Sequence, residues 1–255
     1  MSEQHVFLGD AMALCPTFEA FDVLITDPPY SAHVHASAVS QSKTRGVRKR
    51  DFGFNSLTPE FREYIARACA GVRRWGIVYS DVESVALMRA AVEVQGGTYI
   101  RTIPWVRWSM PQLSGDRPTT GWEALLVTLG SDCETIVCTW GAQGGRKHWN
   151  GPGNLTHLAH KCLRGEDKHR AEKPLDQALD LVSWFSDPED VVFDPCAGSG
   201  TIGLACRILG RSYIGCEIDP AWAERAQERI ARVVLSARDD ERMQRWQKTE
   251  AARAA

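Results

Sequence analysis

Short apolar runs alternate with amphipathic stretches along most of the chain, and this alternation limits the fold more than any other feature. The apolar runs are expected to form strands and the amphipathic stretches helices, because their hydrophobic periods match those elements. The expected strands are 6–8, 22–26, 76–79, 99–108, 123–129, 191–193 and 212–216. The expected helices are 59–72, 82–94, 175–185, 201–209 and 221–235. This order predicts an α/β fold, with a mostly parallel seven-stranded sheet and helices on both faces.

Composition and charge exclude several classes of protein. With 30 Lys and Arg against 32 Asp and Glu, the formal charge is −2, which excludes a globally basic protein but not a local basic face. No apolar run approaches the roughly 20 residues of a membrane-spanning helix. The polar start also lacks a signal-peptide core, so we expect a cytoplasmic protein without membrane contact. Eight scattered cysteines form no Cys-x-x-Cys pair, and we expect no metal site.

The segment 191–203 predicts a ligand site. A hydrophobic strand runs into a tight glycine turn that opens a helix, where small residues let the backbone approach a ligand. The helix N-terminus offers free N–H groups at the same place. Glu217 follows at the end of the next expected strand, where its carboxylate can accept both hydroxyls of a ribose.

The glycine pattern at 198, 200 and 203 also matches the fingerprint of a dinucleotide site, so an NAD enzyme is an alternative. Too little chain follows Glu217 to build such a site, and Asp194 would face a pyrophosphate with a carboxylate. A cationic amine suits Asp194 better, which indicates one adenosine joined to an amino-acid group. The missing strands must come from the N-terminal half, and this predicts a permuted strand order. Asp10, after strand 6–8, is then suited to accept a hydrogen bond from the adenine amino group.

A second motif, Asp27-Pro28-Pro29-Tyr30, directly follows strand 22–26. The two prolines stiffen the turn and remove two N–H donors, which leaves the Asp27 carboxylate and the Pro28 carbonyl as acceptors. An exocyclic –NH2 group has two hydrogens and needs two acceptors held rigidly. Tyr30 offers a flat face on which a base can stack.

Together, these two motifs resemble those of the S-adenosylmethionine-dependent DNA amino-methyltransferases. The catalytic motif precedes the cofactor motif, which looks like the beta class. Segment 169–175 is similar to the stretch that precedes the cofactor strand in that class, and segment 215–219 looks like its ribose-binding strand end. Segment 111–118 looks like a stretch of phage-type members. The resemblance implies a circularly permuted, Rossmann-like methyltransferase fold, S-adenosylmethionine as cofactor and double-stranded DNA as partner. A homodimer is one of the oligomeric states compatible with it.

The resemblance also implies a role for each matching residue. The target base would be held by Asp27, Pro28, Pro29 and Tyr30. In the cofactor site, Asp10 would bind the adenine, Glu217 the ribose, and Lys173 would lie near the methionine carboxylate. The other expected cofactor residues are Asp194, Pro195, Cys196, Gly198, Gly200, Thr201, Ile218 and Asp219. Cys196 departs from the usual Phe, and Arg170 from the usual Pro.

Two segments that follow expected strands interrupt the alternation, 31–56 and 140–170, and both are rich in basic residues. The residues expected to neutralise DNA phosphates are Lys43, Arg45, Arg48, Lys49, Arg50, Arg146 and Lys147. We expect one methyltransferase domain, 1–235, followed by a charged tail, 236–255. The domain would comprise a catalytic half at 1–139, a short target-recognition insertion at about 140–168 and a cofactor half at 169–235.

The expected reaction is methyl transfer to the N6 amine of a flipped adenine, because Asp rather than Ser precedes Pro-Pro-Tyr, an inference from resemblance alone. Cytosine N4 stays open, since both bases present the same –NH2 group. An inactive member that binds DNA as a regulator is a further alternative. Cytosine-C5 chemistry is rejected, because Cys196 lies inside the cofactor loop.

Overall fold

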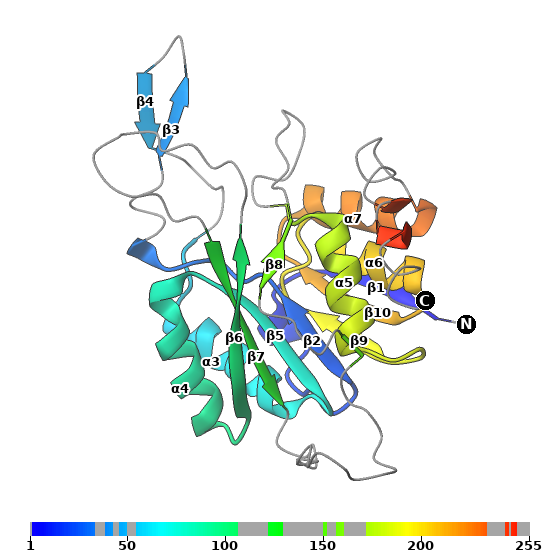
Figure 1. The fold of residues 1–255 in the computed structure, drawn as a ribbon, viewed down its shortest axis with the longest axis horizontal. Coiled ribbons are helices and arrows are strands. Elements are labelled where there is room, and N and C mark those ends of the chain that lie inside the picture. The colour runs from blue at the N-terminus through cyan, green and yellow to red at the C-terminus, as the bar shows by residue number, and fades with distance from the viewer. Residues whose placement is uncertain are drawn as a thin grey trace.

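The structure, a computed structural model, describes residues 2–33, 39–42, 46–49, 55–106, 122–129, 150–151, 157–160, 172–233, 243–244 and 246–248. A single large sheet occupies the centre of the molecule, with strand order β1-β10-β9-β2-β5-β7-β6-β8 (Figure 1). In that order, the strands are Gln4–Leu8, Ser212–Glu217, Val191–Asp194, Val23–Thr26, Trp75–Ser80, Trp122–Leu129, Thr98–Val106 and Leu158–Ala159. The seven expected strands are confirmed, and β8 adds a two-residue strand at one edge.

The strand order is permuted, as the sequence predicts. Strands β1, β10, β9, β2 and β5 lie side by side in the sheet and are all parallel. They bring segments from the two ends of the chain together. Leu8 of β1 pairs with Glu217 of β10, and Leu24 of β2 pairs with Phe193 of β9. β7 is antiparallel to both β5 and β6, so its first residues lie at the sheet edge where the parallel strands end. The two motifs of the sequence therefore meet at one edge of the sheet.

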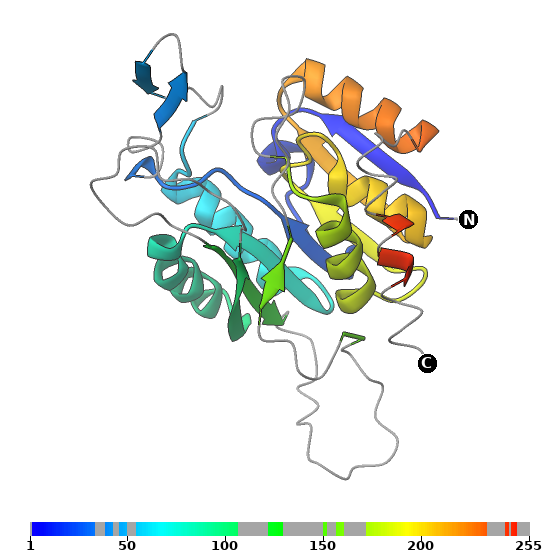
Figure 2. The same ribbon diagram turned by 45° about the horizontal axis from the view of Figure 1, so that its top comes forward.

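Helices cover both faces of the sheet (Figure 2). On one face lie α5 (Leu175–Phe185), α6 (Thr201–Leu209) and α7 (Pro220–Arg232), whose core includes Val23 and Ile25. On the other face lie α1 (Ala11–Leu14), α3 (Pro59–Gly71) and α4 (Val85–Val94), whose core includes Leu24. Successive strand residues point to opposite faces. A continuous apolar run such as that of β2 is therefore typical of a strand covered on both sides.

Local capping signals explain where two of the helices begin. Thr58 Oγ1 accepts a hydrogen bond from the Phe61 N–H at 3.2 Å at the start of α3, and Pro59 takes the first helical position. At the start of α7, Asp219 Oδ1 accepts the Ala221 N–H at 2.8 Å, and Pro220 follows the cap. Proline suits this position because the first N–H of a helix has no partner within the helix.

Two parts of the chain differ from the sequence prediction. Segment 31–56, expected as an irregular basic loop, contains an antiparallel hairpin of β3 (Val39–Ser42) and β4 (Gly46–Lys49), with Gln41 opposite Val47. This hairpin forms a separate sheet and stands away from the main one (Figure 1). The expected helix 82–94 begins instead with a 3₁₀ turn, Val82–Ser84, capped by Asp81.

Among the described residues, no helix has the length and apolar character required to cross a bilayer.

Candidate active site

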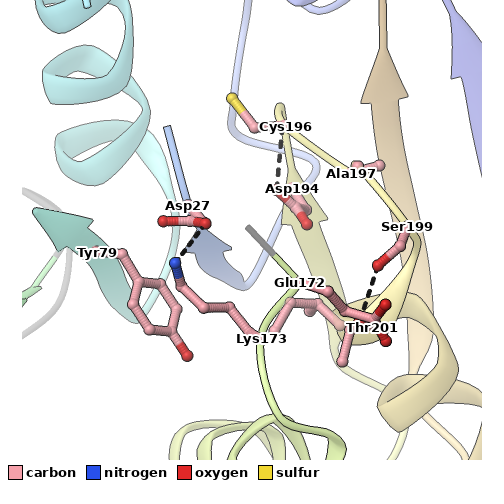
Figure 3. Close-up of a pocket in the computed structure, with 11 residues that line it drawn as sticks. Asp27, Tyr79, Glu172, Lys173, Asp194, Cys196, Ala197, Ser199 and Thr201 are labelled. Atoms are coloured by element: carbon pink, nitrogen blue, oxygen red, sulfur yellow. Dashed lines mark hydrogen bonds and ion pairs between the residues drawn. The ribbon is translucent and has the colours of Figure 1, made fainter. Parts of the chain in front are cut away.

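A cavity lies at the carboxyl ends of β2, β5 and β9, where ligands bind in open α/β sheets (Figure 3). With its open mouth it has a volume of about 420 Å³. Its lining residues are Asp27, Tyr79, Glu172, Lys173, Asp194, Cys196, Ala197, Gly198, Ser199, Thr201 and Ile202. The cavity thus brings together one residue of the Asp-Pro-Pro-Tyr motif and much of the glycine loop, which are more than half the chain apart in sequence.

Two backbone N–H groups hold the Glu217 carboxylate, one from the glycine loop and one from the turn after β10. The Gly198 N–H donates to Glu217 Oε2 at 2.8 Å, and the Asp219 N–H donates to Oε1 at 2.9 Å. Gly198 has φ 51°, in the left-handed region that favours glycine. The carboxylate of Glu217 is therefore oriented beside the loop, and its contact with a ribose stays a prediction.

Two other glycines of the loop allow close packing. A Cβ atom at Gly200 would lie 2.9 Å from Ala226 Cβ, and one at Gly203 would lie 2.5 Å from Ile230 Cδ1. Both contacts are with α7, and Gly200 is not among the residues that line the cavity. The sequence predicts that small residues in this loop admit a ligand. Gly200 and Gly203 also serve to bring α7 against the loop.

Asp194 is a buried carboxyl group at the end of β9, with 2% of its surface exposed. It accepts hydrogen bonds from Thr26 Oγ1 at 2.9 Å, from the Cys196 N–H at 3.0 Å and from the Tyr213 hydroxyl at 3.4 Å. Burial raises the pKa of Asp194 to about 7, although the bonds from Cys196 and Thr26 oppose this rise. A cation nearby would favour its ionised form.

Asp27 follows β2 and forms an ion pair with Lys173. Its Oδ2 lies 2.6 Å from Lys173 Nζ, whereas its Oδ1 is buried and has no hydrogen-bond partner (Figure 3). Burial raises the pKa of Asp27; Lys173 opposes this rise, and the negative charge of Glu123 adds to it. Burial pulls the pKa of Lys173 down, but Asp27 and Glu123 outweigh it, so the net shift is upward. The expected contact of Lys173 with the cofactor carboxylate stays a prediction.

Three residues that were not predicted from the sequence contribute to this cluster: Glu123, Tyr79 and Trp105. The Tyr30 hydroxyl donates to Glu123 Oε2 at 2.6 Å, and Lys173 Nζ lies 3.4 Å from the same oxygen. The ring centroids of Tyr79 and Trp105 lie 4.8 and 5.6 Å from Lys173 Nζ. The signal for Glu123 was the single charged residue in an otherwise uncharged strand, 122–129.

The remaining expected cofactor residues lie along the same sheet edge. Asp10 follows β1 and is exposed; its Oδ1 accepts the Met12 N–H at 2.9 Å and caps α1. The neighbouring Gly9 N–H donates to the Glu217 carbonyl at 2.8 Å, so Asp10 and Glu217 stand at adjacent strand ends. Ile218 is 70% exposed next to them. The structure therefore groups these residues as the permuted order predicts, and their contacts with a ligand stay predictions.

Most of the predicted DNA-contacting residues lie outside the described residues: Lys43, Arg45, Arg50, Arg146 and Lys147. Arg48 and Lys49 belong to β4, of which only the backbone is described.

Comparison with known proteins points to one enzyme family. Residues 139–228 match the family of N6/N4 methyltransferases described as DNA methylase. The Type II methyltransferase M.HpaI of Haemophilus parainfluenzae is 23% identical over 246 residues, covering 89% of this chain and 74% of the relative. The Type II methyltransferase M2.DpnII of Streptococcus pneumoniae is 24% identical over 228 residues, covering 83% of each protein.

Solved structures share the fold along most of the chain. The M1.HpyAVI–SAM complex superposes with a TM-score of 0.61 at 23% identity, covering 89% of this chain and 99% of the other. The cytosine-N4-specific PvuII DNA methyltransferase superposes with a TM-score of 0.57 at 14% identity, covering 97% and 93%. The Rossmann-like fold, the permuted motif order and the relatives agree. Together they support an S-adenosylmethionine-dependent DNA amino-methyltransferase, of a family that includes both adenine-N6 and cytosine-N4 enzymes.

Proposed function

We propose that this protein transfers the methyl group of S-adenosylmethionine to the N6 amine of adenine in double-stranded DNA. The observation that carries the proposal is Asp27 Oδ1, a buried acceptor without a hydrogen-bond partner at the edge of the cavity. Leaving such an acceptor unpaired costs roughly 1–3 kcal/mol. We infer that an N–H group of the substrate takes this place.

The Asp27-Pro28-Pro29-Tyr30 turn would hold the flipped base. Asp27 Oδ1 and the Pro28 carbonyl would each accept one amine hydrogen, which turns the lone pair of the nitrogen away from both oxygens. The Tyr30 ring would stack on the base, and its hydroxyl is tethered to Glu123. Flipping a base from the duplex costs a few kcal/mol. Rate enhancement would come from alignment of the amine and from placement of charge.

Lys173 supports this chemistry by favouring the ionised form of Asp27. With the ammonium on Oδ2, the second oxygen is left as an acceptor for the amine. The amine loses a proton when it is methylated, and Asp27 Oδ1 is placed to receive it. The ordinary pKa of lysine lies well above neutrality, and the two carboxylates raise it further, so the ammonium keeps its charge.

The residues around the glycine loop suit the cofactor. S-adenosylmethionine supplies an electrophilic methyl group on a positively charged sulfur. Asp194 is a buried carboxyl suited to its ammonium group, and Glu217 is an oriented carboxylate suited to its ribose. Asp10, one strand further, would accept from the adenine amine. Around them, Pro195, Cys196, Gly198, Gly200, Thr201, Ile218 and Asp219 would shape the site.

The organisation of the chain is proposed on the same basis. A single domain, 1–235, would contain a target-recognition insertion at about 140–168 and be followed by a charged tail. Lys43, Arg45, Arg48, Lys49, Arg50, Arg146 and Lys147 would contact DNA phosphates. Assembly into a homodimer stays a prediction, which light scattering of the purified protein tests.

The proposal is tested with purified protein, unmethylated duplex DNA and S-adenosylmethionine that carries an isotope-labelled methyl group. After digestion to nucleosides, mass spectrometry identifies the base that carries the label. We expect labelled N6-methyladenine. Labelled N4-methylcytosine would replace adenine by cytosine as the target, and label in neither base would contradict the proposed activity.

A further inference from the structure

Glu123 is a buried carboxylate at the start of a central strand, and the fold gives little reason for a charge there. Its side chain is 11% exposed, and Ala124, Leu125, Leu126 and Val127 follow it as a buried apolar run. A carboxylate is unfavourable in such surroundings unless it is paired. A buried ion pair rarely stabilises a fold more than apolar side chains of similar size would. The position of Glu123 therefore calls for a reason beyond stability.

The contacts of Glu123 lead to the two residues proposed to hold the target base. Its Oε2 accepts the Tyr30 hydroxyl at 2.6 Å, a short distance typical of a hydrogen bond to a charged acceptor. The same oxygen lies 3.4 Å from Lys173 Nζ, which in turn lies 2.6 Å from Asp27 Oδ2. One carboxylate is thus linked directly to the stacking ring, and it is linked to the amine acceptor through the Lys173 ammonium, which also lies 3.5 Å from the Tyr30 hydroxyl.

The surrounding side chains keep this linkage in one arrangement. Trp105 of β6 pairs with Glu123 of β7 in the strand register, and its ring centroid lies 5.6 Å from Lys173 Nζ. The ring centroid of Tyr79 in β5 lies 4.8 Å from the same nitrogen. Aromatic faces attract a cation and exclude water from it. With Lys173 confined between rings and carboxylates, Glu123 and Asp27 share one cation at defined distances.

We propose that Glu123 is a positioning residue for the target base, fixing the Tyr30 ring through its hydroxyl and orienting Asp27 through Lys173. The proposal rests on the proposed function. It predicts a loss of turnover without a loss of cofactor binding, because displacing a reacting group by about 1 Å can lower a rate by about 100-fold.

The charge of Glu123 gives a readout that a purely structural role would not affect. The titratable and charged groups that face Asp27 are Lys173, Glu123, Tyr30, Asp194, Tyr79 and Cys196. Among them, Glu123 raises the pKa of Asp27 by its negative charge. Replacement by Gln removes that charge at nearly constant shape, so the pKa of Asp27 falls. The acidic limb of the kcat profile should then move to lower pH.

The experiment uses Glu123→Ala, Glu123→Gln, Tyr30→Phe and the double variant Glu123→Ala with Tyr30→Phe. Turnover is measured at saturating cofactor, so that titration of Asp194 does not enter the kcat profile. We expect Glu123→Ala to lower kcat about 10- to 100-fold with the KM for S-adenosylmethionine within about twofold of wild type. The double variant should lose less than the product of the two single losses, because both remove the same hydrogen bond.

Thr128→Val is the matched control in the same strand. It removes another buried polar contact, Thr128 Oγ1 to the Gly76 carbonyl at 3.2 Å, far along β7 from the site. It should leave kcat and its pH profile unchanged. If Glu123→Ala does not fold, Glu123→Gln and its acidic limb carry the test.

The outcomes separate the two proposals. Wild-type turnover in Glu123→Ala would overturn the positioning role, as would strictly additive losses combined with an unmoved acidic limb in Glu123→Gln. A wild-type protein that methylates no exocyclic amine would overturn the proposed function instead.

Discussion

Cofactor affinity should depend on pH through one buried carboxyl group, Asp194. Burial raises the pKa of Asp194 to about 7 in the ligand-free protein. The ammonium of the cofactor favours the ionised form, so Asp194 must release its proton for tight binding. The affinity should therefore fall as the pH drops from 7.5 through 7, approaching about tenfold for each unit below the pKa. At pH 6, the dissociation constant should be roughly 10 times its value for the protein with Asp194 fully ionised.

Isothermal titration calorimetry with S-adenosylmethionine between pH 5 and 7.5 measures this dependence. The range stays below the pKa of the ligand's own α-amino group, ordinarily about 7.7–8.0. In Asp194→Asn, the amide oxygen can still accept from Thr26 and Cys196, but no carboxyl titrates. Its affinity at pH 7.5 should be lower by about 1.5–3 kcal/mol and flat over the range. A flat wild-type profile, or an Asn variant with the full pH dependence, would show that Asp194 does not control cofactor binding.

Three further predictions follow from the site. Asp27→Ala should lower turnover by about 10²–10³ and leave cofactor affinity within a few-fold, because Asp27 is proposed to bind the target amine and not the cofactor. Steady-state kinetics and calorimetry check this, and wild-type turnover would contradict it. Glu217→Ala should weaken S-adenosylmethionine binding by roughly 1.5–3 kcal/mol through lost ribose hydrogen bonds, and unchanged affinity in calorimetry would remove it from the site. Arg48→Ala, Lys49→Ala and Arg50→Ala combined should reduce the salt slope of DNA binding by roughly 0.9 for each lost phosphate contact. An unaltered slope would assign the phosphate contacts to other residues.

Much of the fold could be predicted because its signals are local. The strand 22–26 is a continuous apolar run with turn residues at its end, and the structure buries it on both faces. Pro59 and Pro220 follow capping side chains and mark helix starts within a residue or two. The permuted order followed from a simple count, since too few residues remain after Glu217 to complete a sheet.

The rest depends on contacts between distant residues. Tyr30 and Glu123 are 93 positions apart, and only the antiparallel register of β7 brings the carboxylate to the catalytic edge. The packing role of Gly200 depends on where α7 lies. The hairpin β3–β4 has little hydrophobic periodicity, so its backbone pairing left no pattern in the sequence.

Adenine methylation by this protein is tested by sequencing modified bases in DNA from a methylation-deficient host. Cells that express the wild-type protein are compared with cells that express Asp27→Ala at the same level. We expect N6-methyladenine at a short recurrent sequence in the first DNA and none in the second. Unmodified DNA from wild-type cells, or equal methylation by both proteins, would contradict it.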